Sequence, residues 1–448
     1  MRKFLFFTAL VGIIFGIWLF GDHFSAQQRE ATIHHSSSSI FADAVMITNA
    51  EEKNVYLYLV FPSGEAANPQ DEGLAHYVEH LAWLSALGGS GRVQTRHTNA
   101  WTNRFSTGYW QKTVGGELHG DLRTLISVSM PLSVEPEFAL EERSIILREY
   151  DYRIAERPLY PVFLDMDRVL YGYGTLARSI IGEPSVIAEF SLEAAAVLHK
   201  QSHILSDATL LVYGDVNIAQ FEAAVASLAG EEEPKPVTRS TDTWVEHGSA
   251  KDSAAASLPA LSEGTFLYRK LVPLAPCGDP VHCAMVAHIA ESALVSSLPG
   301  GLAGPLRFDQ FVARSFSFNI GLIGNDYVEI SFTAHPDNGV SLEELESAFR
   351  NAFLTTLEKG LTQETFGRVA SRVEGQLSSV LDRDRPSYNR DLALGRLMLG
   401  QSIFSLSDKV ITVESIRLED VNQFLKSLLI DGREATRLVA VEEYFDDE

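Results

Sequence analysis

Basic residues are scarce in this chain. Its 448 residues include 36 Lys and Arg against 59 Asp and Glu, which gives a formal net charge of −23. This deficit excludes a broad nucleic-acid-binding face as the default function. It fits either an acidic inner surface that favours basic or neutral ligands, or plain solubility. The chain is otherwise of ordinary globular composition, 46% hydrophobic and 21% charged, and is long enough for two or more domains.

Several common functional motifs are also missing. Gly172-Tyr-Gly174 lacks the third glycine of a dinucleotide loop, and Gly300-Gly-Leu-Ala-Gly304 lacks the Lys-Ser/Thr of a phosphate-binding loop. No grouping of Ser, His and Asp is defined well enough to indicate a serine nucleophile. His199 and His203 lie four apart without a carboxylate between them, and we interpret them as cations near the end of a helix.

Only two cysteines occur, Cys277 and Cys283, with five residues between them. In an exported chain this spacing favours a local disulfide. The alternative is a second metal site formed by Cys277, His282 and Cys283, but no fourth ligand lies nearby in the sequence.

The N-terminus has the pattern of an export signal. Arg2 and Lys3 precede an apolar run from Phe4 to Phe20. Its 17 residues are at the short limit for a spanning helix and the long limit for a signal-peptide core. Because Phe24-Ser25-Ala26 carries a large residue where cleavage needs a small one, residues 1–24 slightly favour an uncleaved membrane anchor over a signal peptide. The rest is predicted outside the cytoplasm, which means the periplasm in a Gram-negative cell, either free or held at the inner membrane.

The most informative segment is His76-Tyr-Val-Glu79-His80, inside a helix predicted over 71–87. Two histidines four apart share one helix face and can hold one Zn²⁺. Glu79 can then reach a metal-bound water as general base. The helix itself is predicted by an apolar stripe made of Leu74, Val78, Leu81 and Leu84, with Asp71 as its N-cap and Gly88-Gly89 as its stop.

A catalytic zinc site needs a third protein ligand and one open position. The candidates lie on a helix predicted over 136–156, with Pro136 in its first turn. Glu142 and Glu149 are seven residues apart, hence two turns apart on one face. One of them can bind the metal while the other supports a ligand by hydrogen bonding.

Three segments together resemble the pitrilysin/insulinase family of zinc peptidases, and in particular its two-domain members of the mitochondrial processing peptidase type. They are Gly73-Leu-Ala-His-Tyr-Val-Glu-His80, then Asn99-Ala-Trp-Thr102 with Thr107 and Tyr109, then Glu142-Arg-Ser-Ile-Ile-Leu-Arg-Glu149. The resemblance covers nearly the whole chain after about residue 40. The interval between His80 and Glu149 is somewhat short for the family, which we interpret as a trimmed loop around 88–96.

The resemblance implies a role for each matching residue. His76, His80 and Glu149 would bind Zn²⁺, Glu79 would be the catalytic base, and Glu142 would support a ligand. Asn99 would hold the main chain of a peptide or unfolded polypeptide that adds to an exposed edge strand. Arg307 matches the family's Arg in the second half and would be a substrate-clamping and catalytic residue. Arg314 stands where the family has Tyr, and it would either replace the Tyr hydroxyl as a substrate-binding donor or mark an altered specificity.

The second half of the chain repeats the first. Ala75–Gly89 and Ala287–Gly301 share six of their residues, but Ser292 stands where the first half has His80, so His288 and Glu291 have no partner ligand. The family shows such a duplication. It therefore implies an α+β fold of two homologous halves, each a mainly antiparallel sheet with helices packed on one side.

The predicted organisation has five parts. They are the signal or anchor at 1–24, a polar spacer at 25–38, a zinc-binding domain at 39–230, a linker at 231–262 and a homologous domain without an intact zinc site at 263–448. The predicted function is a zinc endopeptidase that works as a homodimer or a heterodimer with a related subunit. Two rivals stay open: a non-catalytic partner subunit that binds substrate peptides, and a metal-stabilised scaffold at the membrane.

Overall fold

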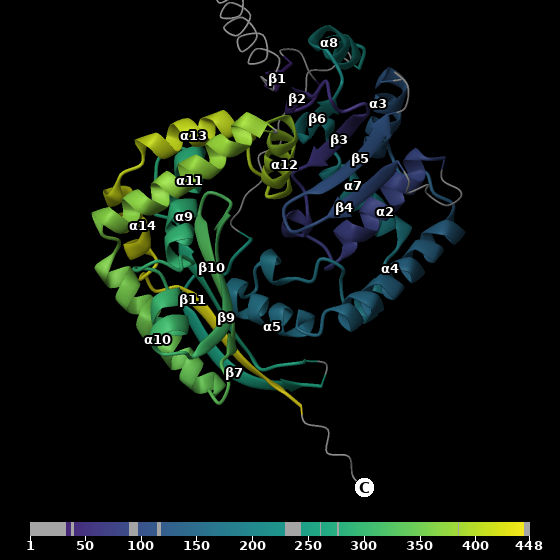
Figure 1. Ribbon diagram of the computed structural model, residues 1–448. Helices are drawn as coiled ribbons and strands as arrows, with labels where there is room; N and C mark the ends of the chain where they lie inside the picture. Colours follow the sequence, from purple (N-terminus) through teal and green to yellow (C-terminus); the bar gives the residue numbers. More distant parts are fainter. Residues whose placement is uncertain are drawn as a thin grey trace, which may run out of the picture.

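The computed structural model describes residues 33–36, 40–88, 97–113, 118–228, 243–259, 261–275, 277–383 and 385–442. Two sheets, one from each half of the chain, lie side by side with their helices (Figure 1).

The first half forms a six-stranded sheet in the order β1-β2-β6-β3-β5-β4. Its strands are β1 (Ile33–His35), β2 (Asp43–Thr48), β3 (Val55–Phe61), β4 (Thr98–Thr102), β5 (Thr107–Thr113) and β6 (Thr209–Gly214). Its helices are η1 (Glu65–Ala67), α2 (Leu74–Ala86), α3 (Leu118–Ile126), η2 (Ser127–Ser129), α4 (Pro136–Glu156), α5 (Tyr160–Tyr171), η3 (Thr175–Ala177), α6 (Pro184–Ile187), α7 (Leu192–Ser202), η4 (Leu205–Asp207) and α8 (Ile218–Ala226).

The second half forms a five-stranded sheet in the order β7-β11-β8-β10-β9. Its strands are β7 (Ala250–Leu258), β8 (Thr265–Pro273), β9 (Ala313–Ile323), β10 (Tyr327–Pro336) and β11 (Arg433–Val441). Its helices are α9 (Pro280–Leu294), η5 (Gly304–Asp309), α10 (Leu342–Lys359), α11 (Gln363–Arg383), α12 (Arg385–Met398), α13 (Leu406–Ser415) and α14 (Leu418–Ser427).

The two sheets share one topology, which confirms the predicted fold class. In each half the first strand of the repeat pairs in parallel with the last, β2 with β6 and β7 with β11. The other neighbouring strands are antiparallel, and the chain visits equivalent strands in the same order. The repeat first seen in fifteen residues therefore extends over the whole sheet.

Helices pack on both faces of each sheet. One face is covered by helices of the same half, and the opposite face by a helix of the other half. Helices of the same half pack on one face, as predicted: α2, α3 and α8 on the first sheet, and α9, α10, α11 and α14 on the second. The opposite face of the first sheet is covered by α12, through Ala393 and Leu397, and that of the second sheet by α5, through Met166 and Leu170. One helix of each half therefore packs on the sheet of the other half (Figure 1). This exchange joins the two halves into one packed body.

A buried ionic cluster reinforces this exchange of helices. Asp167 on α5 accepts from Arg269 on β8 at 2.6 Å, and Arg269 also contacts Glu329 on β10 at 2.6 Å. Arg104, in the turn after β4, pairs with Asp167, and the Tyr171 hydroxyl donates to Glu329. Two cations and two anions therefore meet at the junction, so that each charge has a partner away from water.

Two local predictions were wrong. Residues 33–35, predicted in the polar spacer, form β1 because they pair with β2. Residues 250–258, predicted in the linker because they lack an apolar pattern, form β7, since main-chain pairing with β11 stabilises a strand whose side chains are mostly exposed. Residues 25–32 and 37–38 of the predicted spacer and 231–242 of the predicted linker lie outside the described residues, as does most of the trimmed loop.

Within the described residues, no helix is long and apolar enough to cross a membrane. The apolar run from Phe4 to Phe20 lies outside them. Cys277 and Cys283 form the predicted disulfide, with 5.3 Å between their Cα atoms. Their sulfurs are therefore not available as metal ligands, and the alternative site with His282 was wrong.

Candidate metal centre

Helix α2 presents the two histidines from a well-anchored position. Its apolar stripe is buried as predicted, with Leu74 and Leu81 at 0% exposure, against α4 and α7. The Tyr77 hydroxyl donates to the Ala139 carbonyl of α4 at 2.8 Å, which fixes the spacing between these helices.

The start of α2 differs from the prediction. The N-cap is Gly73, at φ 82, and not Asp71. A Cβ atom at this position would meet the backbone of Ile181 and Gly182 at 2.5 Å. Glycine is therefore required here both for the left-handed conformation and for the close approach of the two chains.

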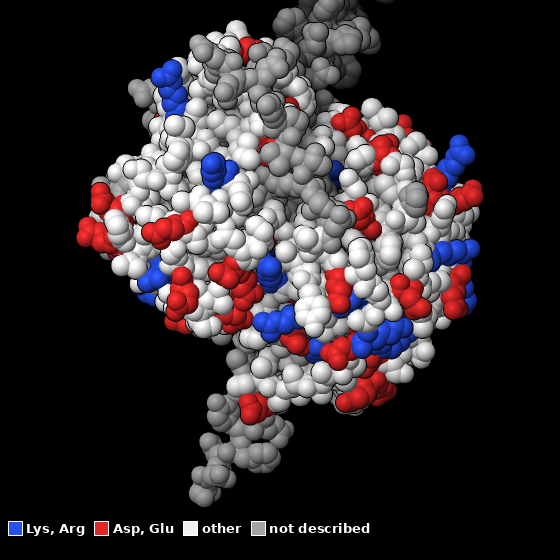
Figure 2. Space-filling model, turned by 180° about the vertical axis from the view of Figure 1, so that it is seen from behind, with Lys and Arg blue, Asp and Glu red and all other residues white. Residues whose placement is uncertain are grey.

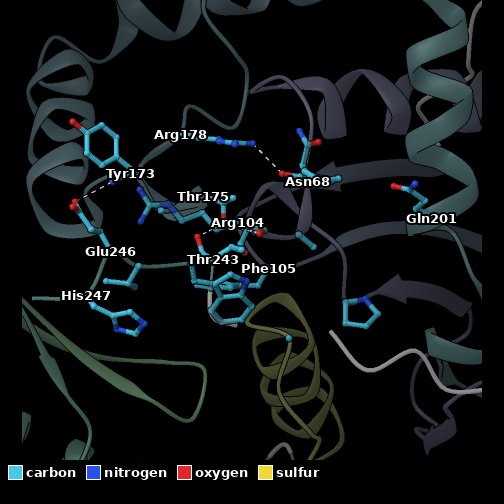
Figure 3. A pocket seen from close by; sticks show the side chains of 18 residues that line it. Asn68, Arg104, Phe105, Tyr173, Thr175, Arg178, Gln201, Thr243, Glu246 and His247 are labelled. Atoms are coloured by element: carbon cyan, nitrogen blue, oxygen red, sulfur yellow. Dashed lines mark hydrogen bonds between the residues drawn. The ribbon is translucent and has the colours of Figure 1, made fainter. Parts of the chain in front are cut away.

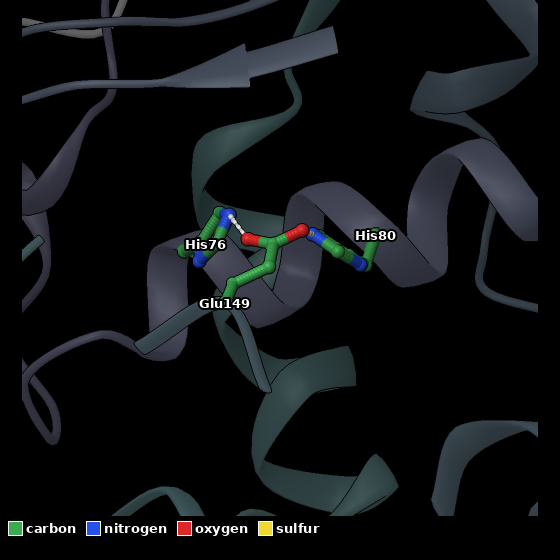
Figure 4. Close-up of side chains that lie close together, drawn as sticks. All are labelled: His76, His80 and Glu149. Atoms are coloured by element: carbon green, nitrogen blue, oxygen red, sulfur yellow. Dashed lines mark ion pairs between the residues drawn. The ribbon is translucent and has the colours of Figure 1, made fainter. Parts of the chain in front are cut away.

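Three donor groups converge from α2 and α4. His76 Nε2 lies 3.6 Å and His80 Nε2 4.0 Å from the carboxylate oxygens of Glu149 (Figure 4). One ligand atom from each of the three lies within 4.8 Å of the other two. Ligands about 2.0–2.1 Å from a tetrahedral zinc would be about 3.3 Å apart. Two imidazoles and one carboxylate at these separations therefore fit a zinc ion with one position left open.

Glu142 orients one of the histidines. Its carboxylate accepts from His80 Nδ1 at 2.7 Å, which leaves Nε2 as the nitrogen that faces Glu149. Burial alone would lower the pKa of His80, but the hydrogen bond to Glu142 and the neighbouring carboxylates outweigh it and raise that pKa. Of the two alternatives that the spacing left open, the structure places Glu149 at the histidines' Nε2 atoms and Glu142 behind His80.

His76 is the most buried donor, with 5% of its surface exposed. Burial, followed by the proximity of His80 and Arg153, lowers its pKa well below the usual value, so the ring is neutral and suited to bind a metal. Its Nδ1 is buried without a hydrogen-bond partner among the described residues.

Glu79 lies beside this group and is 7% exposed. Burial raises the pKa of its carboxyl, while His80 and the hydrogen bond from the Thr102 hydroxyl, at 2.8 Å, oppose the rise. A buried carboxylate with a raised pKa is a suitable proton acceptor near neutral pH. The bond from Thr102, in the strand after the helix, was not predicted, although the position of that residue in the Asn-Ala-x-Thr segment pointed to the site.

The likeness of this chain to known proteins is one of structure. No protein-family model matches the sequence, and no curated protein does so either. Among solved structures, a protease from Helicobacter pylori superposes with a TM-score of 0.72 at 15% identity, over 92% of this chain and 100% of the other. An M16-like peptidase from Alicyclobacillus acidocaldarius gives 0.73 at 14%, over 92% and 98%. The chain has the two-half fold of the M16 peptidases.

A third structure with this M16 fold is named an inactive domain. It comes from Pseudomonas fluorescens and superposes with a TM-score of 0.72 at 14% identity, over 92% of this chain and 98% of the other. At these identities the likeness concerns the fold, so the chemistry has to be argued from the residues of this chain.

The cavity over the three donors is bordered by an open sheet edge. Its volume is about 700 Å³, and β4, the last strand of its sheet, forms one wall. Asn99 is exposed on β4 and lines the cavity. Arg148 and Arg153 of α4, for which no role was predicted, also line it, and Arg153 lies 3.9 Å from Glu149. The four-residue spacing between Glu149 and Arg153 was the available signal for their contact.

Arg307 and Arg314 do not reach this cavity. All of its described lining residues belong to the first half. Arg307 is exposed on η5, and its guanidinium lies 5.7 Å from the ring of Phe308. Arg314, at the start of β9, pairs with Glu263. Their substrate-binding role remains a prediction.

The second half has no equivalent centre among the described residues. His288 is exposed on α9, and the carboxylate of Glu291 accepts from the main-chain nitrogen of Ile320 at 2.8 Å. Glu291 thus contacts the edge strand β9 of the second sheet, just as Glu79 contacts the edge strand β4 of the first sheet.

A larger cavity of about 990 Å³ lies at the junction of the halves (Figure 3). Its charged side chains already have partners, since Arg178 donates to the carbonyls of Asn68 and Gln70 and Arg104 pairs with Asp167. The three convergent donors therefore make the smaller cavity the better candidate for a reaction.

The histidines at the end of α7 are buried, and His199 is not a cation, contrary to our interpretation. His199 is 3% exposed and bonds to the Val128 carbonyl at 2.7 Å, and His203 bonds to the Tyr109 hydroxyl at 2.7 Å. Burial lowers the pKa of His199, so it is a neutral core residue.

Proposed function

We propose that the protein is a zinc-dependent endopeptidase that hydrolyses peptides or unfolded segments outside the cytoplasm. The observation that carries this proposal is the convergence of His76, His80 and Glu149 from two helices, with the buried Glu79 alongside. A Zn²⁺ held by these three would polarise the scissile carbonyl and lower the pKa of a bound water to about 7.

The chain's own residues would transfer the proton, position the reacting groups and bind the peptide. Glu79 takes the proton from the attacking water and passes it to the leaving amine. Thr102 holds the Glu79 carboxylate in place, and Glu142 holds the ring of His80. Because β4 is a sheet edge, an extended peptide can add to it by main-chain pairing, next to Asn99. This geometry favours unfolded segments over folded substrates.

The remaining features of the proposal come from the sequence. The segment 1–24 exports or anchors the chain, so that the site works in the periplasm of a Gram-negative cell. Arg307 and Arg314 lie away from the cavity of their own chain. They would serve as substrate contacts in a dimer, made of two copies or of this chain with a related subunit.

Glu79→Gln tests the mechanism. This variant should retain zinc and lose hydrolysis of a quenched peptide, because the amide cannot accept the proton. His80→Ala and Glu149→Ala should instead lose the metal. Metal analysis and turnover measured on one preparation distinguish the two classes. Unchanged turnover in Glu79→Gln would end the proposal.

A non-catalytic partner subunit is the second candidate, since one protein with the same fold is named an inactive domain. The two are separated by assaying the purified chain alone, with and without a chelator. Chelator-sensitive cleavage supports the enzyme. Zinc binding and peptide binding without cleavage support the partner subunit.

A further inference from the structure

A third cavity, of about 420 Å³, lies beside the Cys277–Cys283 disulfide. Its walls come from the disulfide loop, the turn between β9 and β10, and the segment between α12 and α13. Arg396 is the one charged residue among its described lining residues. A cavity that holds a single cation points to an anionic ligand.

The guanidinium of Arg396 is buried with most of its donors unused. The residue is 8% exposed, its Nε donates to the Ser402 carbonyl at 3.0 Å, and the group lies 4.2 Å from the ring of Phe404. It makes no ion pair with any described carboxylate. This contrasts with Arg269, which is equally buried but contacts two carboxylates. Because guanidinium carries five N–H donors, Arg396 retains the two-pronged face that matches a carboxylate.

Lys409 is a second cation near Arg396, outside the lining of the cavity. It is half-buried on α13, has no ion pair with a described residue, and its ammonium lies 5.8 Å from the ring of Tyr388. Burial and then the charge of Arg396 lower the pKa of Lys409, and burial lowers that of Arg396 to about 10. Two uncompensated cations are costly, and an anion between or beside them would relieve that cost.

The segment that carries Gln401 borders the cavity and also contacts the turn after β4. Ser106 donates to the Met398 carbonyl at 3.3 Å, and Gly400 faces Phe105. A peptide paired with the edge of β4, as proposed above, would run toward this segment. Gln401 and Asn325 also line the cavity, and the Gln401 amide donates one hydrogen bond to the Leu322 carbonyl at 3.4 Å.

We propose that this cavity binds a carboxylate of the substrate peptide, with Arg396 as its cation and Gln401 and Asn325 beside it. The proposal rests on the proposed peptidase function, and it adds a preference for where a peptide ends. The carboxylate has two possible sources, the C-terminus of the peptide and an Asp or Glu side chain near it.

Binding to the full chain with Glu79→Gln tests the site without turnover. The probes are three peptides with the same N-terminal fluorophore: a free acid, its C-terminal amide, and the amide with a terminal Asp. The free acid should bind about 10-fold more tightly than the plain amide, since a hydrogen-bonded charge pair contributes about 1.5–3 kcal/mol. The Asp-amide identifies the source, since it binds like the free acid if a side-chain carboxylate serves equally well.

Arg396→Gln should bring the free acid and the amide to equal affinity, and Arg396→Lys should restore part of the difference. Arg372→Gln is the matched control, because Arg372 is exposed on α11 and should leave the preference intact. Thermal melts establish that each variant is folded. Equal affinity of the parent for all three probes, or a preference that survives in folded Arg396→Gln, overturns the proposal.

Failure of the proposed function gives a different result. Zinc content and peptide cleavage are measured in parallel on the chain with Glu79 intact. A carboxylate preference without cleavage would refute the peptidase and keep the binding site. Cleavage without the preference would refute the site and keep the peptidase.

Discussion

Replacing Arg269 by Met should destabilise the junction between the halves. Arg269 is 6% exposed and contacts Asp167 and Glu329, each at 2.6 Å. Met has a similar length and fills the space, so that the main effect is the loss of charge. The variant leaves two buried carboxylates with one remaining cation, Arg104.

The magnitude follows from this charge count. Removing one partner of a buried ion pair costs about 3–5 kcal/mol, because the other charge is left uncompensated. Arg104 still pairs with Asp167, so the lower end, about 3 kcal/mol, is expected. Unfolding entropy of about 2.1 cal/mol/K per residue over 448 residues is about 0.9 kcal/mol/K. If the shared helices make the chain unfold as one unit, the melting temperature should fall by about 3 °C.

The loss should also depend on pH. Burial raises the pKa of Asp167 even with Arg269 present, and the variant removes a cation that opposes the rise. An acid with a raised pKa in the folded state favours folding most at low pH, and this contribution is lost as pH rises through the folded value. The melting temperature of Arg269→Met should therefore lie further below that of the parent at pH 8 than at pH 5.

Two further variants make the reasoning refutable. Asp167→Asn combined with Arg269→Met should be more stable than Arg269→Met alone, since it removes one stranded charge. Arg372→Met, on an exposed helix face, should change stability by no more than about 0.5 kcal/mol. If Arg269→Met melts with the parent, or the double variant melts lower than the single one, the ionic cluster does not stabilise the junction as argued.

Three predictions concern the metal centre. Glu142→Gln should weaken zinc binding about 10–100-fold, because it changes the acceptor that orients His80; unchanged affinity in chelator competition would contradict this. Thr102→Val removes a hydrogen bond that lowers the pKa of Glu79, so that pKa should rise. The acidic limb of the pH profile of kcat/KM should then move to higher pH. An acidic limb that does not move would count against Glu79 as the base. Gly73→Ala places a Cβ atom 2.5 Å from backbone atoms at a φ of 82. The free energy of unfolding should fall by about 1–3 kcal/mol in thermal melts, and metal analysis should show lower zinc occupancy. Values like those of the parent would exclude strain at the start of α2.

Local patterns in the sequence determined the elements with strong periodicity. The bounds of α4 agree with the predicted helix residue for residue. This helix depends on features only a few residues apart, such as the proline in its first turn. The two candidate metal-binding histidines could be proposed for the same reason, since their four-residue spacing by itself puts them on one face.

Only the tertiary structure decided how distant segments meet. Strand β7 has almost no apolar pattern, and it exists because β11, far along the chain, pairs with it. The spacing left Glu142 and Glu149 interchangeable, since both lie on one face of α4, and only the family resemblance distinguished them. The packing of α4 on α2 places Glu142 at His80, 62 residues away, and Glu149 at both imidazoles. The exchange of α5 and α12 between the halves is likewise a matter of long-range packing, which the spacing of neighbouring residues does not encode.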